Sequence, residues 1–193
     1  MRRILTQKIY IIIYMKSKKI LLTIIVLIIV LCAVILGTIA YCFPIKYKDS
    51  IIETSAEFDL SPVLVASVIN AESRFRADAI SQKGAVGLMQ LLPSTAAEIA
   101  QKLGIQDFTE KDLFTPKTNI RLGTSYLSYL INEFDNVDTA LCAYNAGPNK
   151  VRSWLNNPKY SEDGKSLTII PYAETQKYVK KISFYTKFYA GYF

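Results

Sequence analysis

Residues 61–75 read SPVLVASVINAESRF and join an apolar run to a single acidic residue. Ser61 can cap the start of a helix and Pro62 suits its first position, which is a common pairing. The apolar side chains that follow recur at helical spacing and predict one buried face: Leu64, Val65, Val68 and Ile69. Glu72 comes near the last turn, so we expect a core helix that ends in one carboxyl group.

The chain around this stretch predicts a mainly α domain. Thr95 and Glu98 match a capping box, and Gly104 would end the helix that the box opens. The other expected elements are helices over residues 49–58, 118–134, 139–145, 149–155 and 172–189, turns over 76–93 with at most a short hairpin near 78–90, and a surface loop over 156–171.

A second apolar run, residues 20–43, contains 24 residues and no charge. At a rise of about 1.5 Å per residue, it is long enough to cross a hydrocarbon core of roughly 30 Å. A cleaved signal peptide usually has a shorter apolar region that ends in small residues. This run ends in AYCF, and the bulky Tyr41 also fits a lipoprotein site at Cys42 poorly. The sequence therefore favours an uncleaved transmembrane anchor.

Charge predicts the orientation of this anchor. Residues 1–48 hold eight Lys or Arg and no acidic residue, and most of these charges precede the span. The positive-inside rule then predicts a cytoplasmic N-terminus over residues 1–19. We expect a juxtamembrane linker over 44–48 and an extracytoplasmic catalytic domain over 49–193. Met15 is an alternative start to Met1.

The composition excludes several function classes. The chain has no histidine, which rules out a Ser-His-Asp triad, a Cys-His pair and a His-ligated zinc site. Residues 49–193 hold 15 basic and 16 acidic residues, so nucleic acid is not an expected partner. Cys142 is the only cysteine outside the span, so no disulfide can form within the domain. We expect neither a metal nor a cofactor.

Glu72 is the residue best placed for chemistry. Unpaired carbonyl groups at a helix C-terminus disfavour a carboxylate, and apolar neighbours such as Ile69 and Phe75 add to this effect. A carboxyl group that stays protonated near neutral pH can donate a proton to a glycosidic oxygen. The alternative is an exposed glutamate paired with Arg74 or Arg76.

Five other positions offer groups that suit a sugar. Gly87, with Gly84 before it, would let the backbone approach a ligand. Met89 and Gln90 offer a soft apolar contact and an amide, and the pair Tyr144-Asn145 offers a phenol and a second amide. Each also has a purely structural interpretation, as a turn, a core methionine or a helix cap.

Five motifs in this order resemble the family 1 lytic transglycosylases, relatives of goose-type lysozyme. They are Glu72-Ser73, Gly87-Leu88-Met89-Gln90, Asn119-Ile120 with Gly123-x-x-Tyr126-Leu127, Ala143-Tyr144-Asn145-Ala146-Gly147, and Glu174-Thr175-x-x-Tyr178-Val179. The resemblance covers residues 50–190 and implies a lysozyme-like fold. It also implies cleavage of the β-1,4 bond between N-acetylmuramic acid and N-acetylglucosamine in peptidoglycan, with a 1,6-anhydromuramoyl end as product.

The resemblance also implies residue roles. Glu72 would be the single acid and base, and Ser73 would hydrogen-bond near the scissile sugars. Gly87, Met89, Gln90, Tyr144 and Asn145 would belong to the substrate groove, and Glu174 and Tyr178 would support the acid from beneath.

Two other functions remain open at this point. A water-using muramidase normally needs a second carboxylate, for which Asp78 is the candidate beside Glu174. A non-catalytic peptidoglycan-binding scaffold of a cell-envelope machine would bind sacculi without cutting them.

Overall fold

A computed structural model describes residues 2–193, with the side chains of Arg3 and of residues 14–193. Met1, one of the two candidate starts, lies outside the described residues. The chain divides into two compact units, of which the first ends at Cys42 and the second spans Phe43–Phe193.

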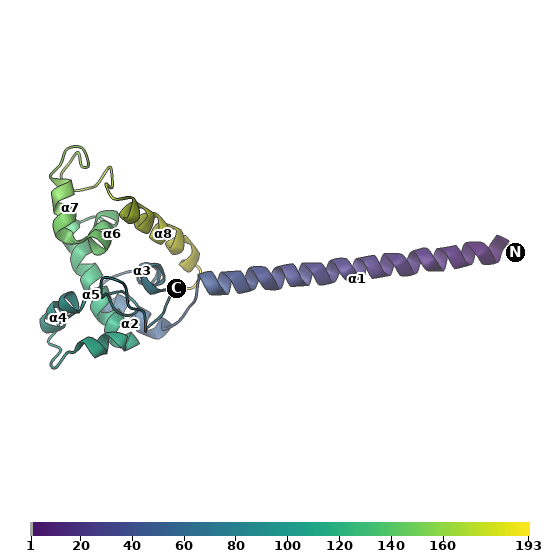
Figure 1. Cartoon of the computed structure of the whole chain (residues 1–193), viewed down its shortest axis with the longest axis horizontal. Helices are drawn as coiled ribbons and strands as arrows, with labels where there is room; N and C mark the ends of the chain where they lie inside the picture. Colours follow the sequence, from purple (N-terminus) through teal and green to yellow (C-terminus); the bar gives the residue numbers. More distant parts are fainter. Residues whose placement is uncertain (1) are drawn as a thin grey trace. The chain divides into compact units, whose positions relative to one another are not determined.

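The first unit is one long helix, α1 (Arg2–Cys42) (Figure 1). Its portion Tyr14–Cys42 is long and apolar enough to cross a membrane, a test that a signal sequence near an N-terminus also meets. The expected helical run therefore forms, but it ends one residue early. Phe43 belongs to the second unit, because its ring packs there against other aromatic side chains.

The second unit is helical, as the sequence predicts. Its elements are α2 (Lys48–Glu57), α3 (Pro62–Ser73), α4 (Pro93–Lys102), the 3-10 helix η1 (Glu110–Phe114), α5 (Pro116–Phe134), α6 (Val137–Ala146), α7 (Pro148–Leu155) and α8 (Ala173–Tyr189). Within the part of the chain that the structure describes, extended pairing is limited to two isolated antiparallel bridges, Ile80 with Val86 and Val86 with Leu91. The possible hairpin is thus a compact loop.

One predicted helix start is wrong. Thr95 and Glu98 do not form a capping box, because α4 already begins at Pro93 with Leu92 at its N-cap. Proline fits the first turn of a helix without loss of a hydrogen bond, so the helix starts three residues earlier than the predicted capping box would place it. The capping box of this domain forms instead at Thr109, whose backbone N–H and hydroxyl donate to Asp112 Oδ2 over 2.7 and 2.9 Å.

The core positions α3 between the remaining helices. Val65, Val68 and Ile69 of its predicted inner face are fully buried, and Leu64 is half-buried. They pack with side chains of α5, α6 and α8 in the larger of two apolar clusters. The smaller cluster joins α4 and η1 to the outer side of α5. The helix that carries Glu72 is therefore fixed along its whole length.

Candidate active site

Glu72 lies in the last turn of α3, where the sequence predicts it. The chain leaves the helix through two consecutive residues with left-handed backbone, Arg74 (φ 53°) and Phe75 (φ 60°). Such conformations are uncommon for residues other than glycine and need support from their surroundings. Phe75 has that support, because its side chain is buried in the core. The turn thus ends α3 directly after the acid.

Helix α8 supplies both groups that act on the Glu72 carboxyl. The Tyr178 hydroxyl donates a hydrogen bond of 2.6 Å to Glu72 Oε1. The Lys181 ammonium donates to the carbonyl oxygen of Ala71, one residue before the acid, over 2.9 Å. The two donors lie three residues apart and therefore share one face of the helix.

Burial raises the pKa of Glu72 from 4.5 to about 7, which confirms the expected direction. The Tyr178 hydrogen bond and the charge of Lys181 oppose this rise in pKa, because both favour the carboxylate. Burial and the charge of Glu72 raise the pKa of Tyr178 well above its usual 10, so the phenol keeps its proton. Glu72 can therefore exist in both protonation states near neutral pH.

The carboxyl opens into a groove on the surface of the domain. A cavity of about 370 Å³ is lined by Glu72, Gln90, Tyr144, Asn145 and Glu174, and by the loop residues Ser81, Gln82, Lys83, Ala85 and Leu92. A neighbouring cavity of about 320 Å³ shares Gln90, Tyr144 and Asn145 and leads to Pro148. A third, of about 390 Å³, lies between α4, α5 and α7.

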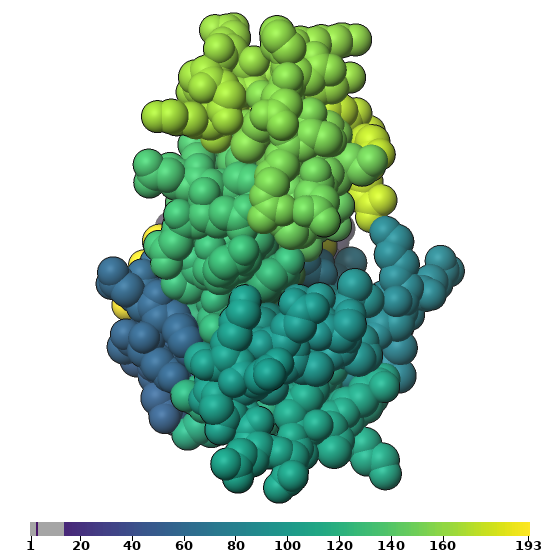
Figure 2. Space-filling view, turned by 90° about the vertical axis from the view of Figure 1, so that its left-hand side faces the viewer, coloured from purple at the N-terminus to yellow at the C-terminus, as the bar shows by residue number. Residues whose placement is uncertain are grey.

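The three cavities share lining residues in succession, so they form one extended groove. In Figure 2, the outline of the molecule narrows between the teal residues near 100 and the green residues near 150.

Three of the predicted groove residues lie in this lining. Gln90 has left-handed backbone, and its amide Nε2 donates to the carbonyl oxygens of Ala79 and Gly87 over 3.1 and 2.9 Å. The Tyr144 hydroxyl donates to the Met89 carbonyl oxygen over 2.8 Å. Asn145 Oδ1 accepts a hydrogen bond of 2.8 Å from the hydroxyl of Thr175.

Three other predicted residues support the groove without lining it. Ser73 is 2% exposed, and its hydroxyl donates to the Leu88 carbonyl oxygen over 2.8 Å, so the expected contact with sugars is corrected. Met89 is fully buried and belongs to the core, because it fills the space beside Gly123. Gly87 has φ +81°, and a Cβ there would lie 2.1 Å from Asn119 Nδ2. Close approach of protein, rather than of ligand, requires this glycine.

Asn119 carries the structural function that the sequence analysis missed. Its Oδ1 accepts from the Met89 backbone N–H over 2.8 Å, and its Nδ2 donates to the carbonyl oxygens of Val86 and Leu113 over 3.0 and 2.8 Å. One buried amide thus ties the loop before α4 to α5. Its place in the motif Asn119-Ile120 signalled importance but gave no role.

The two predicted supports of the acid differ. Tyr178 contacts Glu72 directly, whereas Glu174 is exposed at the start of α8 and lines the same cavity as Glu72. Asp78 is exposed on the loop after α3 and is not among the residues that line the three cavities. Glu174, rather than Asp78, is therefore the better-placed second carboxylate.

A carboxyl group whose pKa is raised by burial and that faces an extended groove is a feature of enzymes that cleave glycans. Residues 49–167 match the model of the family described as the transglycosylase SLT domain, and the chain belongs to this family. The expected mainly α fold of the lytic transglycosylases, preceded by one apolar helix, is confirmed.

Relatives and solved structures agree. The chain is 37% identical over 150 residues to the soluble lytic murein transglycosylase of Salmonella typhimurium. The aligned residues cover 76% of this chain and 23% of that protein. It is 37% identical over 94 residues to the membrane-bound lytic murein transglycosylase E of Buchnera aphidicola, covering 48% and 42% of the two chains.

Its fold is similar to the lytic transglycosylase Slt of Pseudomonas aeruginosa, solved as an inactive mutant, with a TM-score of 0.71 and 33% identity over 79% of this chain and 25% of that one. A 70-kDa soluble lytic transglycosylase in complex with bulgecin A gives a TM-score of 0.69 and 30% identity, over 78% and 25%. The chain thus spans about a quarter of the length of the soluble relatives.

Proposed function

We propose that this protein is a peptidoglycan lytic transglycosylase that cleaves the β-1,4 bond between N-acetylmuramic acid and N-acetylglucosamine. One observation carries the proposal: the carboxyl of Glu72 faces an extended groove and has a pKa of about 7. A group with such a pKa can serve as acid and as base within one catalytic cycle at neutral pH. The names of the relatives support the choice of substrate.

In the first half of the reaction, protonated Glu72 donates its proton to the glycosidic oxygen. The bond between that oxygen and C1 of the muramoyl residue breaks, and the N-acetylglucosamine side leaves as an alcohol. The glycosidic electron pair leaves with the oxygen, so positive charge develops at C1. The carboxylate that remains is held by the Tyr178 hydroxyl and by the nearby charge of Lys181.

In the second half, the Glu72 carboxylate removes the proton from the C6 hydroxyl of the same muramoyl residue. The C6 oxygen forms a bond to C1 and closes the 1,6-anhydro ring. Glu72 is protonated again, so no water is consumed and one carboxyl group suffices. Gln90, Tyr144 and Asn145 line the groove where they can contact the sugar chain.

A water-using muramidase is the second candidate, and Glu174 is the observation that favours it. Its carboxylate shares the cavity with Glu72 and could orient a water molecule toward C1. The product would then carry a reducing muramic end instead of an anhydro end.

Mass spectrometry of muropeptides released from purified peptidoglycan tests both functions. The wild type should release products that are one water lighter than hydrolytic ones, and Glu72→Gln should release none while it keeps its helical circular dichroism. Hydrolytic products that disappear in Glu174→Gln would instead establish a muramidase. Sacculus binding without released products would reject both activities.

We infer that α1 anchors the catalytic domain to the cell membrane, with the N-terminus in the cytoplasm and the domain outside. The length and apolarity of Tyr14–Cys42 and the basic residues that precede it support this topology. Protease added to intact spheroplasts should remove the domain and leave a protected N-terminal fragment. Full protection of the chain would reject the orientation.

A further inference from the structure

The residue that directly follows the apolar helix is packed into an aromatic cluster on α8. The ring of Phe43 stacks on Phe188 with centroids 3.7 Å apart and meets the edge of Tyr185 at 5.5 Å. The Phe184 ring is tilted against the Phe43 ring, with centroids 6.0 Å apart. Aromatic pairs at these separations attract one another beyond simple burial. Phe43 is thus a fixed part of the domain.

The next residues are also held by the C-terminal end of the chain. The hydroxyl of the fully buried Tyr189 donates to the Pro44 carbonyl oxygen over 2.9 Å. The Lys48 ammonium donates to the Tyr192 carbonyl oxygen over 2.5 Å and lies over the ring of Phe193. Residues 44–48, expected to be a linker, are therefore attached to α8 and to the C-terminal residues.

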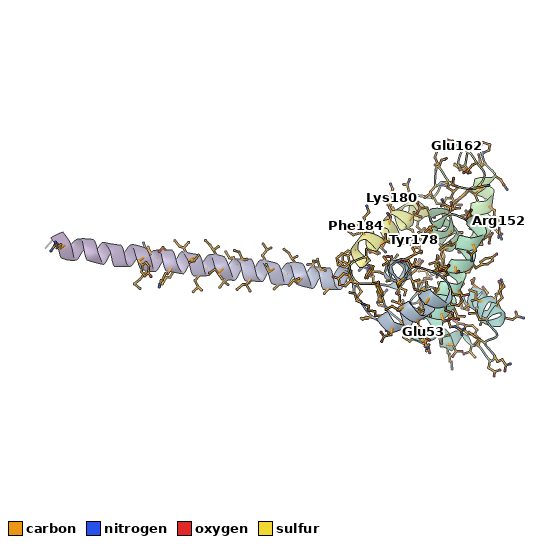
Figure 3. All side chains as sticks on the ribbon, turned by 180° about the vertical axis from the view of Figure 1, so that it is seen from behind. Glu53, Arg152, Glu162, Tyr178, Lys180 and Phe184 are labelled. Carbon is orange, nitrogen blue, oxygen red and sulfur yellow. The ribbon has the colours of Figure 1, made fainter. Side chains whose placement is uncertain are left out.

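The same region exposes large apolar side chains. Phe184 is 61% exposed, Tyr192 is 41% exposed and Ile45 is 39% exposed. Figure 3 shows Lys180 and Phe184 on the outer side of α8, whereas Tyr178 points inward toward the site. None of these three side chains lines the groove, so substrate binding there does not explain their exposure.

Lysines surround these exposed rings. Lys177, Lys180 and Lys187 are exposed. Lys180 and Lys187 lie about one turn from Phe184 on the same face of α8, and Lys177 lies two turns before it. Residues 43–48 and 177–193 together hold six lysines and no acidic residue, although the domain as a whole is nearly neutral. A surface that combines aromatic rings with lysines is suited to an anionic lipid interface, where rings sit at headgroup level and ammonium groups contact phosphates.

We propose that this surface, formed by Ile45, Phe184, Tyr192 and the three exposed lysines of α8, docks on the anionic surface of the membrane. The proposal rests on the proposed anchoring by α1. Cys42 ends the candidate span, and Phe43, which packs against Phe184 and Phe188, is the next residue in the chain. An apolar span that ends directly before this part of the chain makes lipid the expected partner. All six of these residues lie outside residues 49–167, the part of the chain that the family model matches.

Fluorescence of the full-length chain in vesicles tests the docking. Phe184→Trp places a reporter on the surface, and the single native tryptophan, Trp154, is buried and supplies a constant background. Vesicles contain phosphatidylcholine and phosphatidylglycerol, with bromine on the upper acyl chain. We expect quenching and a blue shift, because interfacial aromatic groups lie roughly 5–10 Å into the headgroup region. Ile169→Trp is the matched control at a position 51% exposed, and its emission should stay aqueous.

Charge reversal tests the role of the lysines. Lys180→Glu with Lys187→Glu should reduce the quenching of the Phe184→Trp reporter, while the matched pair Lys111→Glu with Lys150→Glu should leave it unchanged. If the chain stays in the membrane after carbonate extraction but the emission of the Phe184→Trp reporter remains that of a tryptophan in water, the docking is refuted. The Phe184→Trp emission could instead shift to the blue without quenching by the brominated lipids, by an amount that depends on protein density. That result would identify a second copy of the chain as the partner and would also refute the docking on lipid.

Two further measurements distinguish a failure of the docking proposal from a failure of the proposed anchor or of the proposed enzymatic function. A chain released by carbonate refutes the anchor, and the docking with it. Muropeptide release from solubilised glycan by Phe184→Trp should equal that of the wild type, since the substitution lies away from the groove. Loss of muropeptide release in both chains would refute the enzymatic function while the quenching result stands.

Discussion

Removal of one hydroxyl group should raise the pKa of the candidate catalytic acid. Tyr178→Phe keeps a buried ring in place and deletes the donor that lies 2.6 Å from Glu72 Oε1. A hydrogen bond to a charged group contributes about 1.5–3 kcal/mol. One pKa unit corresponds to about 1.4 kcal/mol, so the pKa of Glu72 should rise by roughly 1–2 units from its value near 7.

The pH dependence of kcat/KM measures this change. The free enzyme must hold the proton on Glu72 to begin the reaction, so activity falls as the pH rises through that pKa. In Tyr178→Phe the alkaline limb should therefore move to higher pH. The turnover number should fall as well, because the carboxylate that forms at bond cleavage loses a stabilising donor. Tyr185→Phe, a tyrosine on the same helix outside the site, is the matched control.

An alkaline limb that stays in place, with Glu72 intact, would refute this account of how the pKa of the acid is set. A limb that moves to lower pH would show that Tyr178 favours the protonated form instead.

Three further changes test other contacts of the site. Glu72→Gln should stabilise the fold at high pH. Because folding raises the pKa of Glu72, protonation of this group favours the folded state. This contribution of about 3 kcal/mol is present below pH 4.5 and is lost as the pH rises through 7. Urea unfolding at pH 5 and pH 9 measures it, and an equal effect at both values would contradict it. Lys181→Met should move the alkaline limb upward by less than Tyr178→Phe does, and a downward shift would contradict the assigned sign. Asn119→Ala should cost about 3 kcal/mol of folding free energy, because it leaves a buried N–H and two carbonyl groups without their partner, and wild-type stability would remove Asn119 from its structural role.

The fold and the position of the acid could be predicted because both depend on local patterns. Helical spacing of apolar residues identified the inner face of α3, and a helix end beside apolar side chains implied a raised pKa for Glu72. The pattern could not separate residues that border the groove from those beneath it. Ser73 and Met89 sit in the right motifs, yet both side chains are buried, since periodicity reports which side faces inward and not what lies there.

Contacts between residues that are far apart in the sequence could not be predicted either. Asn119 reaches Met89 across 30 residues and Lys181 reaches Ala71 across 110, and no spacing rule connects such positions. The false helix start at Thr95 has a different cause. Two start signals, Pro93 and a capping-box pattern, lay within one turn, and the sequence alone did not rank them.

The acid and its donor come from opposite ends of the domain, since 106 residues separate Glu72 from Tyr178. A chain emerging from the ribosome or the translocon presents Glu72 early, as an ordinary solvated glutamate. Its pKa reaches the value of the folded state only when α8, the last helix, packs against α3. Proteolytic loss of the C-terminal residues would leave the glutamate in the chain and remove its proton chemistry. The proposed wall-cutting activity would therefore begin only after α8 has been synthesised and has packed against α3.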